Sequence, residues 1–496
     1  MDGPAQVSQC PILPGSSFTY KFKVEQVGTY WYHSHTRGQY VDGLRGPLII
    51  HDPGNPFHAQ FDEEIVLTLS DWYHKEIAEL MPKYKDGGGM MSMEPVPDAN
   101  LLNDTQNLQV PVQPSKTYLV RVVNIGAFVG QYFWIEGHTM TIIELDGSYV
   151  RPTVAEMIYL ASGQRCSFLL TTKVEASQNY PIVASMDQSL IKMSDRVNTD
   201  VVGWLVYDLA QPLPSPVEIK EYNPIDDMGI LPYDDMPLLR KPDQTIILSL
   251  NMEHKNGGSQ YTSYFFNDVT YETPQVPSLF TALISGDAAT SVATYGRSSN
   301  PFVLEHNQVV ELILNNRHMI NHPFHLHGHQ FQAVWRSESG GGDFPVGTLT
   351  EDDFNQKPVR RDTLVLPNGG SMVIRFRADN PGVWLFHCHM EWHAETGLVA
   401  TMIEAPLKLQ QQSIPLAREH FCAPSGTEIS ANVTNEVDSL PKIHEKTSSL
   451  ALGPIVLLLA GFVAIPTVII GIFWICKKGQ SDDEPKYRRL EPSLEL

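Results

Sequence analysis

The stretch Trp384–Ala400, WLFHCHMEWHAETGLVA, carries a compact cluster of metal-binding side chains. Cys388 stands between His387 and His389, and His393 follows a few positions later. Successive side chains of an extended strand point to opposite faces, so we expect Cys388 on one face and both neighbouring imidazoles on the other. A cysteine with two histidines is the ligand set of a mononuclear blue-copper centre, and imidazoles alone also bind copper. The stretch therefore predicts a β-strand that serves two different metal sites.

Two other histidine groups fit the same interpretation. His33 and His35 lie two positions apart in the strand-like segment 28–35, so their imidazoles share a face. The segment 322–329, HPFHLHGH, contributes four more histidines, which are His322, His325, His327 and His329. Each pattern is weak by itself, because most closely spaced histidines are ordinary surface or core residues. Their combination in one β-rich chain predicts several copper sites.

The rest of the chain reads as an all-β protein. Short alternating or β-branched segments are separated by turns rich in the 35 Gly and 36 Pro, as in all-β sandwiches. The predicted strands cover residues 18–26, 28–35, 64–72, 117–125, 244–252, 309–316 and 371–378. Composition changes and Pro-rich linkers predict domains at 1–55, 56–210 and 211–423, followed by a stalk at 424–450.

Charge and hydropathy restrict the class of protein. The 35 Lys and Arg against 56 Asp and Glu give a net charge of −21, which excludes a nucleic-acid partner because a polyanion needs a basic surface. Residues 451–475 contain no charge and are long enough for one transmembrane helix. Lys477 and Lys478 follow directly, so the tail 476–496 is predicted to be cytoplasmic and the catalytic part extracellular or lumenal. The first residues contain no signal peptide, although a single-pass type I membrane protein needs one.

With these motifs the chain resembles the multicopper oxidase family over nearly its whole length, and most closely the membrane-anchored iron-transport branch found in fungi. The resemblance implies tandem cupredoxin-like Greek-key sandwiches, the first one incomplete, plus a C-terminal transmembrane helix. It also implies copper in type 1, type 2 and type 3 centres, where electrons from a donor reduce O2 to water.

The resemblance also assigns roles to individual residues. The implied type 1 ligands are His322, Cys388 and His393, with Leu398 at the axial position. His325 is the implied type 2 ligand, and the implied type 3 ligands are His33, His35, His327, His387 and His389. His329 is expected to be structural.

Further residues match family positions outside the ligand set. Asp2 and Glu391 match the acids that supply protons to the copper cluster. Cys10 and Cys422 match a disulfide, which needs an oxidising compartment. Cys166 and Cys476 are expected to be unpaired.

The sequence departs from the family pattern at its start. The family's first copper motif, HxHG, should lie just upstream of Met1 and is absent. One type 2 and one type 3 ligand are missing with it, so we interpret the sequence as truncated. A half sandwich is expected to expose an unpaired edge and an apolar face.

The electron donor is the remaining question. Glu136 matches a carboxylate that binds Fe(II) in the iron-transport branch, and Tyr264 matches a nearby tyrosine. His318 stands where a second such acid is expected, and an imidazole is a poorer partner for Fe(II). Our first interpretation is therefore a laccase-like oxidase of phenolic or polyketide-type aromatics, with Glu136 and His318 taking the phenolic proton. The alternatives are a cell-surface ferroxidase acting with an iron permease, and an inactive copper-binding remnant.

Overall fold

The structure, a computed structural model, describes residues 2–86, 94–175, 177–191, 197–255 and 261–412. Within the first 55 residues it contains a single antiparallel pair of strands, β1 (Gly28–His33) and β2 (Arg45–Ile50). The predicted strand at 18–26 is wrong: this segment forms no strand, since no described strand lies beside it to complete a ladder. Large apolar side chains are exposed in this part: Ile12, Leu13, Tyr20, Phe22, Val24, Tyr32, Leu44 and Leu48.

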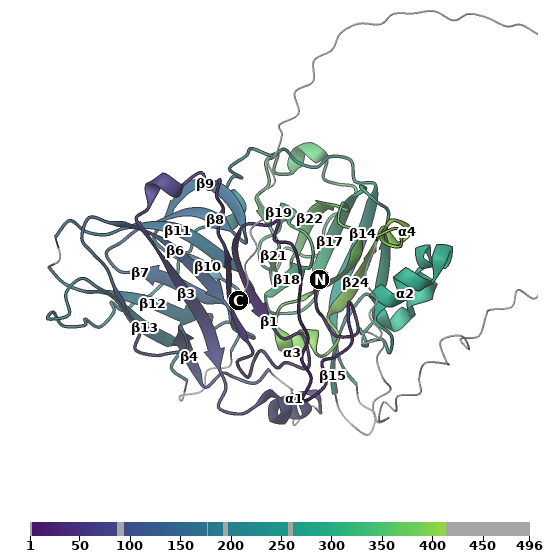
Figure 1. Cartoon of the computed structure of the whole chain (residues 1–496), viewed down its shortest axis with the longest axis horizontal. Helices are drawn as coiled ribbons and strands as arrows, with labels where there is room; N and C mark the ends of the chain where they lie inside the picture. Colours follow the sequence, from purple (N-terminus) through teal and green to yellow (C-terminus); the bar gives the residue numbers. More distant parts are fainter. Residues whose placement is uncertain (1, 87–93, 176, 192–196, 256–260, 413–496) are drawn as a thin grey trace, which may run out of the picture. The chain divides into compact units, whose positions relative to one another are not determined.

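The second domain consists of two sheets (Figure 1). One has the order β4-β3-β6-β11-β8-β9, and the other β10-β7-β12-β13-β5. The strands are β3 (Glu63–Trp72), β4 (Ala99–Leu102), β5 (Gln109–Pro111), β6 (Thr117–Asn124), β7 (Gln131–Ile135), β8 (Met140–Leu145), β9 (Ser148–Ala155), β10 (Ile158–Leu160), β11 (Arg165–Thr171), β12 (Tyr180–Met186) and β13 (Asp200–Val206). The short helices are η1 (His58–Gln60) and α1 (Ile77–Lys85).

The third domain repeats this two-sheet plan with the orders β15-β14-β17-β22-β19-β20 and β16-β24-β23-β18-β21. Its strands are β14 (Gln244–Lys255), β15 (Tyr261–Phe266), β16 (Pro301–Leu304), β17 (Val309–Asn316), β18 (His322–Leu326), β19 (Phe331–Arg336), β20 (Arg360–Arg361), β21 (Thr363–Leu366), β22 (Ser371–Arg377), β23 (Gly382–Cys388) and β24 (Val399–Glu404). Its helical segments, including the preceding linker, are η2 (Asp227–Gly229), α2 (Ser278–Ile284), η3 (Gly286–Thr290), η4 (Val292–Tyr295), η5 (Arg297–Ser299), η6 (Glu351–Asp353), α3 (Glu391–Ala394) and α4 (Pro406–Leu409).

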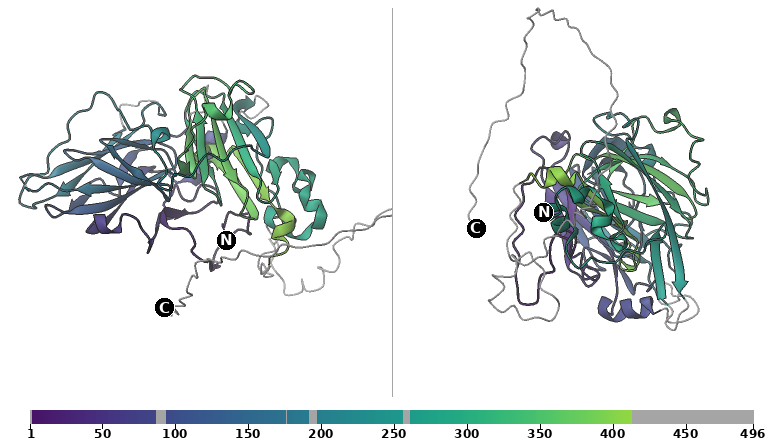
Figure 2. Two further views of the ribbon diagram at one scale, coloured as in Figure 1. Left: turned by 90° about the horizontal axis from the view of Figure 1, so that it is seen from above. Right: turned by 90° about the vertical axis from the view of Figure 1, so that its right-hand side faces the viewer.

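The predicted alternation explains why these strands form. In β3, Leu67 and Leu69 are buried and pack in one cluster with side chains of the facing sheet, such as Phe133 and Ile182. The strand β17 is buried at every position, as expected for a central strand covered on both faces. Figure 2 shows the helices that cover the outer side of the third domain, where Ala282 of α2 and Leu409 of α4 pack in one cluster with strand residues.

Several predictions concern the end of the chain. Among the described residues, no helix is long and apolar enough to cross a membrane, and the predicted transmembrane segment 451–475 lies outside them. Cys10 is disulfide-bonded, whereas its expected partner Cys422 lies outside the described part of the chain. Cys166 is a free, buried thiol, as predicted.

Candidate copper centres

Two strands and a short helix bring together the first candidate site. His322 begins β18, Cys388 ends β23 and His393 lies in α3, and all three are buried. Sγ of Cys388 is 3.6 Å from Nδ1 of His322 and 3.6 Å from Nδ1 of His393. The two Nδ1 atoms are 3.1 Å apart. Three ligand atoms therefore converge on one point, the arrangement expected of a cysteine and two histidines around one copper ion.

Leu398, expected at the axial position, lies next to this site in the fold. Its side chain is fully buried, and its backbone joins the two neighbouring segments: the Cys388 N–H donates to the Leu398 carbonyl at 3.1 Å, and the Leu398 N–H donates to the His393 carbonyl at 3.0 Å. The burial that surrounds the site raises the pKa of the Cys388 thiol. A metal cation is then what would hold the sulfur as thiolate.

The outer nitrogen of each imidazole in this first site has a partner nearer the surface. Nε2 of His322 is 3.0 Å from Nδ1 of His318, which is half-buried. Nε2 of His393 is 2.9 Å from Oε1 of Glu94. The same oxygen of Glu94 accepts hydrogen bonds from the hydroxyl groups of Tyr264 at 3.0 Å and Tyr84 at 3.3 Å. Burial opposes charge on Glu94, but the hydrogen bond and charge of His393 outweigh it and lower the pKa of Glu94 to about 2.

Glu94 takes the place that we predicted for Glu136. The carboxylate of Glu136, just after β7, accepts a hydrogen bond from the Val217 N–H at 2.6 Å. Among the contacts of the described residues, none joins Glu136 to the first site. Glu136 follows the end of β7 on a turn of the second domain, and its role toward the donor stays a prediction. The sequence contains no motif around Glu94 that would have identified it.

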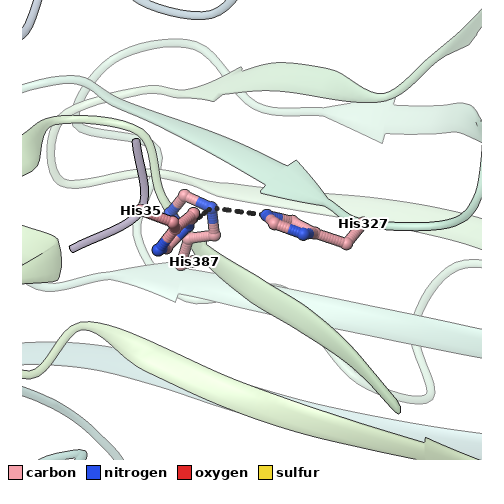
Figure 3. Close-up of side chains that lie close together, drawn as sticks. All are labelled: His35, His327 and His387. Atoms are coloured by element: carbon pink, nitrogen blue, oxygen red, sulfur yellow. Dashed lines mark hydrogen bonds between the residues drawn. The ribbon is translucent and has the colours of Figure 1, made fainter. Parts of the chain in front are cut away.

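The second site is a cluster of histidines from both ends of the chain. Nε2 of His387 lies 3.3 Å from Nε2 of His35 and 3.1 Å from Nε2 of His327 (Figure 3). His389 lies beside this trio, with its ring centroid 5.4 Å from that of His33 and 5.6 Å from that of His325. All six histidines that were assigned to the type 2 and type 3 centres are thus assembled in one place.

Hydrogen bonds at Nδ1 leave Nε2 of four cluster histidines available for a metal. When one ring nitrogen of a neutral histidine donates a hydrogen bond, the other nitrogen carries a free lone pair that can bind a metal. The Nδ1 contacts are His33 with the Ser34 carbonyl (2.9 Å), His325 with the Asp362 carbonyl (2.9 Å), His327 with Oδ2 of Asp2 (2.8 Å) and His387 with the Cys388 carbonyl (2.8 Å). In the first site the pattern is reversed, since Nδ1 faces the sulfur and Nε2 has the outer partner. Both sets of residues fit copper.

The electrostatics of the cluster favour neutral imidazoles. Burial lowers the pKa of His33 to about 4 and lowers the pKa values of His35, His387 and His389 well below the usual range, and neighbouring histidines lower them further. Neutral imidazoles are the form that binds metal. Nδ1 of His389 is buried without a hydrogen-bond partner. A polar atom left in this way in the interior is unusual, and a bound metal ion would satisfy it.

The two predicted acids differ in how they face the cluster. Asp2 contacts it directly through His327, as described above. Glu391 is buried in α3 and accepts a hydrogen bond from the Gly38 N–H. Burial, reinforced by the charge of Glu395, raises the pKa of Glu391 well above its usual range. His329 lies away from the cluster, and its Nε2 is 2.6 Å from Oε2 of the buried Glu404, which agrees with a structural role.

Comparison with known families identifies the chain. Three family models, each described as multicopper oxidase, match residues 1–55, 63–210 and 271–408. A similar curated protein is the iron transport multicopper oxidase FET3 of Gibberella zeae, 48% identical over 480 residues, which are 96% of this chain and 75% of that protein. The chain belongs to the multicopper oxidase family.

Solved structures of multicopper oxidases share its fold. The crystal structure of Fet3p, described as a multicopper oxidase that functions in iron import, matches 85% of this chain and 80% of its own, with 39% identity and a TM-score of 0.81. The laccase of Botrytis aclada matches 82% of this chain and 76% of its own, with 27% identity and a TM-score of 0.68. This multicopper oxidase is accordingly an oxidoreductase with copper centres that uses O2, built on cupredoxin-like sheets.

Proposed function

We propose that this multicopper oxidase is a ferroxidase, which oxidises Fe(II) to Fe(III) one electron at a time and reduces O2 to water. The observation that carries the proposal is the contact of 2.9 Å between Glu94 and His393. The names of similar proteins support it, since those in Gibberella zeae and Saccharomyces cerevisiae are called iron transport multicopper oxidases. This ranks the ferroxidase alternative above our first interpretation, the oxidation of phenols.

The residues divide into two proposed copper-binding sets. His322, Cys388 and His393 would hold the type 1 ion beside Leu398. The type 2 and type 3 ions would be held by His33, His35, His325, His327, His387 and His389. Copper bound at these sets supplies a one-electron acceptor and the place where O2 is reduced. The remaining steps depend on the residues around it.

Glu94 provides the binding site for the donor. Its side chain is 11% exposed and stays ionised, so it presents a hard oxygen ligand at the surface edge of His393. A carboxylate attracts Fe(III) more strongly than Fe(II), because the product carries one more positive charge. Binding to Glu94 therefore favours loss of an electron from iron, and the hydrogen bond to His393 gives that electron a short route inwards.

The backbone of β23 connects the two copper-binding sets. Cys388 is bonded in sequence to His387 and to His389, so an electron that reaches the sulfur has two short covalent routes to the cluster. Reduction of one O2 to two water molecules takes four electrons from four Fe(II) and four protons. Asp2, in contact with His327, and Glu391, whose pKa is raised by its burial, would deliver those protons.

Phenol oxidation is the second candidate function, and His318 is the observation that favours it. Nδ1 of His318 is 3.0 Å from Nε2 of His322. A neutral imidazole at this edge would take the proton of a phenol as its electron leaves. The same imidazole gives Fe(II) no anionic ligand on this side of the site.

The proposed ferroxidase is anchored in a membrane by residues 451–475, and its catalytic part is extracellular or lumenal. Its proposed partner is an iron permease that receives the Fe(III). The anchor falls outside the described residues.

Steady-state O2 uptake tests the choice between the two donors. The copper-loaded protein is offered Fe(II) or a simple phenol over a range of concentrations. We expect a higher kcat/KM for Fe(II). A higher kcat/KM for the phenol would support the second candidate function instead.

A further inference from the structure

The guanidinium group of Arg165, a residue of the second domain, contacts both the first segment of the chain and the third domain. Arg165 begins β11 of the second domain and is 2% exposed. Its Nη1 and Nη2 donate to Oδ1 and Oδ2 of Asp362 in the third domain at 2.6 and 2.7 Å. Its Nε donates to the Thr29 carbonyl of β1 at 2.9 Å, and its Cζ lies 5.3 Å from the ring centroid of Tyr30.

On the side of the third domain, this ion pair leads directly to a proposed copper ligand. Asp362 precedes Thr363, the residue of β21 that pairs with His325 of β18. Nδ1 of His325 is 2.9 Å from the Asp362 carbonyl, 3.0 Å from Oγ1 of Thr363 and 3.5 Å from Oδ1 of Asp362. Oγ1 of Thr363 itself donates to Oδ1 of Asp362 at 2.9 Å. The carboxylate that Arg165 holds is therefore the same one that helps orient the ring of His325.

On the other side, Arg165 fixes the strand that carries the histidines of the first segment. Thr29 and His33 lie on the same face of β1, because they are separated by an even number of positions. Thr29 is also held by Glu144 of the second domain, whose Oε1 accepts from the Thr29 N–H at 2.7 Å. The position of β1 against the third domain is thus set through side chains of the second domain.

We propose that Arg165 is a positioning residue for the histidine cluster: it aligns His325 of the third domain with His33 of the first segment. All proposed copper ligands belong to these two parts of the chain, so the second domain supplies none of them and yet determines how they meet. The inference rests on the proposed role of His325 as a copper ligand and is independent of the electron donor.

The geometry predicts that charge alone does not replace this arginine. A lysine keeps the positive charge, but all its N–H donors sit on one nitrogen. It therefore lacks the planar fork that binds both oxygens of a carboxylate, and it has no separate nitrogen at the position from which Nε of Arg165 donates to the Thr29 carbonyl. Loss of a group that orients a metal ligand typically lowers metal affinity about 10–100-fold. Arg165→Gln should therefore lose copper from the cluster, and Arg165→Lys should be intermediate.

A second buried arginine offers a matched control. Arg375 of β22 is 1% exposed and forms charged hydrogen bonds with Glu311 at 2.6 Å and with Glu351 at 2.7 Å. Among the contacts of the described residues, none joins Arg375 to a proposed copper ligand. Arg375→Gln and Arg375→Lys should therefore lower the thermal stability as the Arg165 variants do, without changing the cluster.

The test measures copper per chain, blue absorption per chain, the EPR spectrum of the type 2 copper and the melting temperature of the copper-loaded protein. We expect Arg165→Gln to keep the blue absorption, to bind copper in the cluster about 10–100-fold more weakly and to change the type 2 EPR spectrum. Asp362→Asn should reproduce these changes, and the double variant should be no worse than either single one. If Arg165→Gln does not fold, Arg165→Lys and Asp362→Asn decide the matter.

Two results would overturn the proposal. One is a set of Arg165 and Asp362 variants whose copper content and EPR spectrum match those of the Arg375 variants. The other is a parent protein that binds copper only at the proposed type 1 site, since there would then be no copper cluster to align. Neither result depends on whether Fe(II) or a phenol is the donor, so the proposed function is tested separately.

Discussion

Oε1 of Glu94 and Nε2 of His393 are 2.9 Å apart, although these residues are 299 positions apart in the sequence. The contact joins a loop of the second domain to a helix of the third, at the edge of the site that holds Cys388. A donor that binds to Glu94 therefore sits one hydrogen bond from a ligand of the proposed type 1 copper. In the proposed ferroxidase, this contact is the point at which Fe(II) would pass its electron to the buried site.

Replacement of Glu94 should affect a metal donor more than an organic one. In Glu94→Ala we expect kcat/KM for Fe(II) to fall roughly tenfold or more, equivalent to about 1.4 kcal/mol of transition-state stabilisation, because the anionic oxygen ligand is lost. Steady-state O2 uptake with Fe(II) and with a neutral phenol measures the difference. Glu136→Ala serves as the control and should leave both reactions near the parent rate. Equal losses for Fe(II) and phenol in Glu94→Ala would show that Glu94 does not bind the metal.

A substitution at His318 adds a carboxylate beside the first site, whereas Glu94→Ala removes one. His318→Asp places a carboxylate at the edge of His322, so we expect a higher kcat/KM for Fe(II) and a lower one for phenols. The same O2-uptake measurement with both donors checks this. A variant with unchanged Fe(II) kinetics would mean that iron uses the Glu94 edge alone, and it would remove His318 as an argument for an organic donor.

Cys388 determines the blue colour in every version of the account. The intense absorption requires a copper–thiolate bond, so Cys388→Ser should lose it completely. The second site should retain its copper, because its ligands are imidazoles. Visible absorption together with metal analysis checks both expectations. Blue colour that survives in this variant would refute the assignment of Cys388.

Asp227 connects the linker to two arginines and predicts a pH effect on stability. Burial alone would raise the pKa of Asp227, but Arg336 and Arg361 lower it below its usual value of 3.8. A depressed folded-state pKa adds stability above the unfolded-state pKa, and this stability is lost as the pH falls from about 4 through the folded-state value. Asp227→Asn should therefore lower the free energy of unfolding by about 1–3 kcal/mol at neutral pH and have a smaller effect in acid. Denaturant titrations at both pH values measure this, and an equal loss at both would contradict it.

Much of this molecule could be predicted because its signals are local. The alternation of apolar residues gave the strands at 117–125, 309–316 and 371–378, which the structure places at β6, β17 and β22. The histidine pairs His33/His35 and His387/His389 were found because residues two positions apart on one strand share a face. Their assignment to particular copper ions stays a prediction, whereas the family and its copper centres are confirmed.

The errors concern contacts between distant segments. The contact of Glu94 with His393 was missed, because the two residues lie 299 positions apart and no local pattern links them. Residues 18–26 have the composition of a strand, yet composition does not supply a neighbour with which to pair. Arg165 gave no signal in the sequence, because its partners Thr29 and Asp362 come from two other parts of the chain.

The most direct test of the ferroxidase account is the reduction of the blue copper without O2. The copper-loaded protein is mixed in a stopped-flow instrument with Fe(II) or with a simple phenol, and the loss of blue absorption is followed. The measurement reports electron entry at the proposed type 1 site and does not depend on the histidine cluster. The account predicts that Fe(II) bleaches the colour faster than the phenol and that Glu94→Ala removes most of this advantage. Faster bleaching by the phenol, with no effect of Glu94→Ala on the reaction with Fe(II), would contradict it.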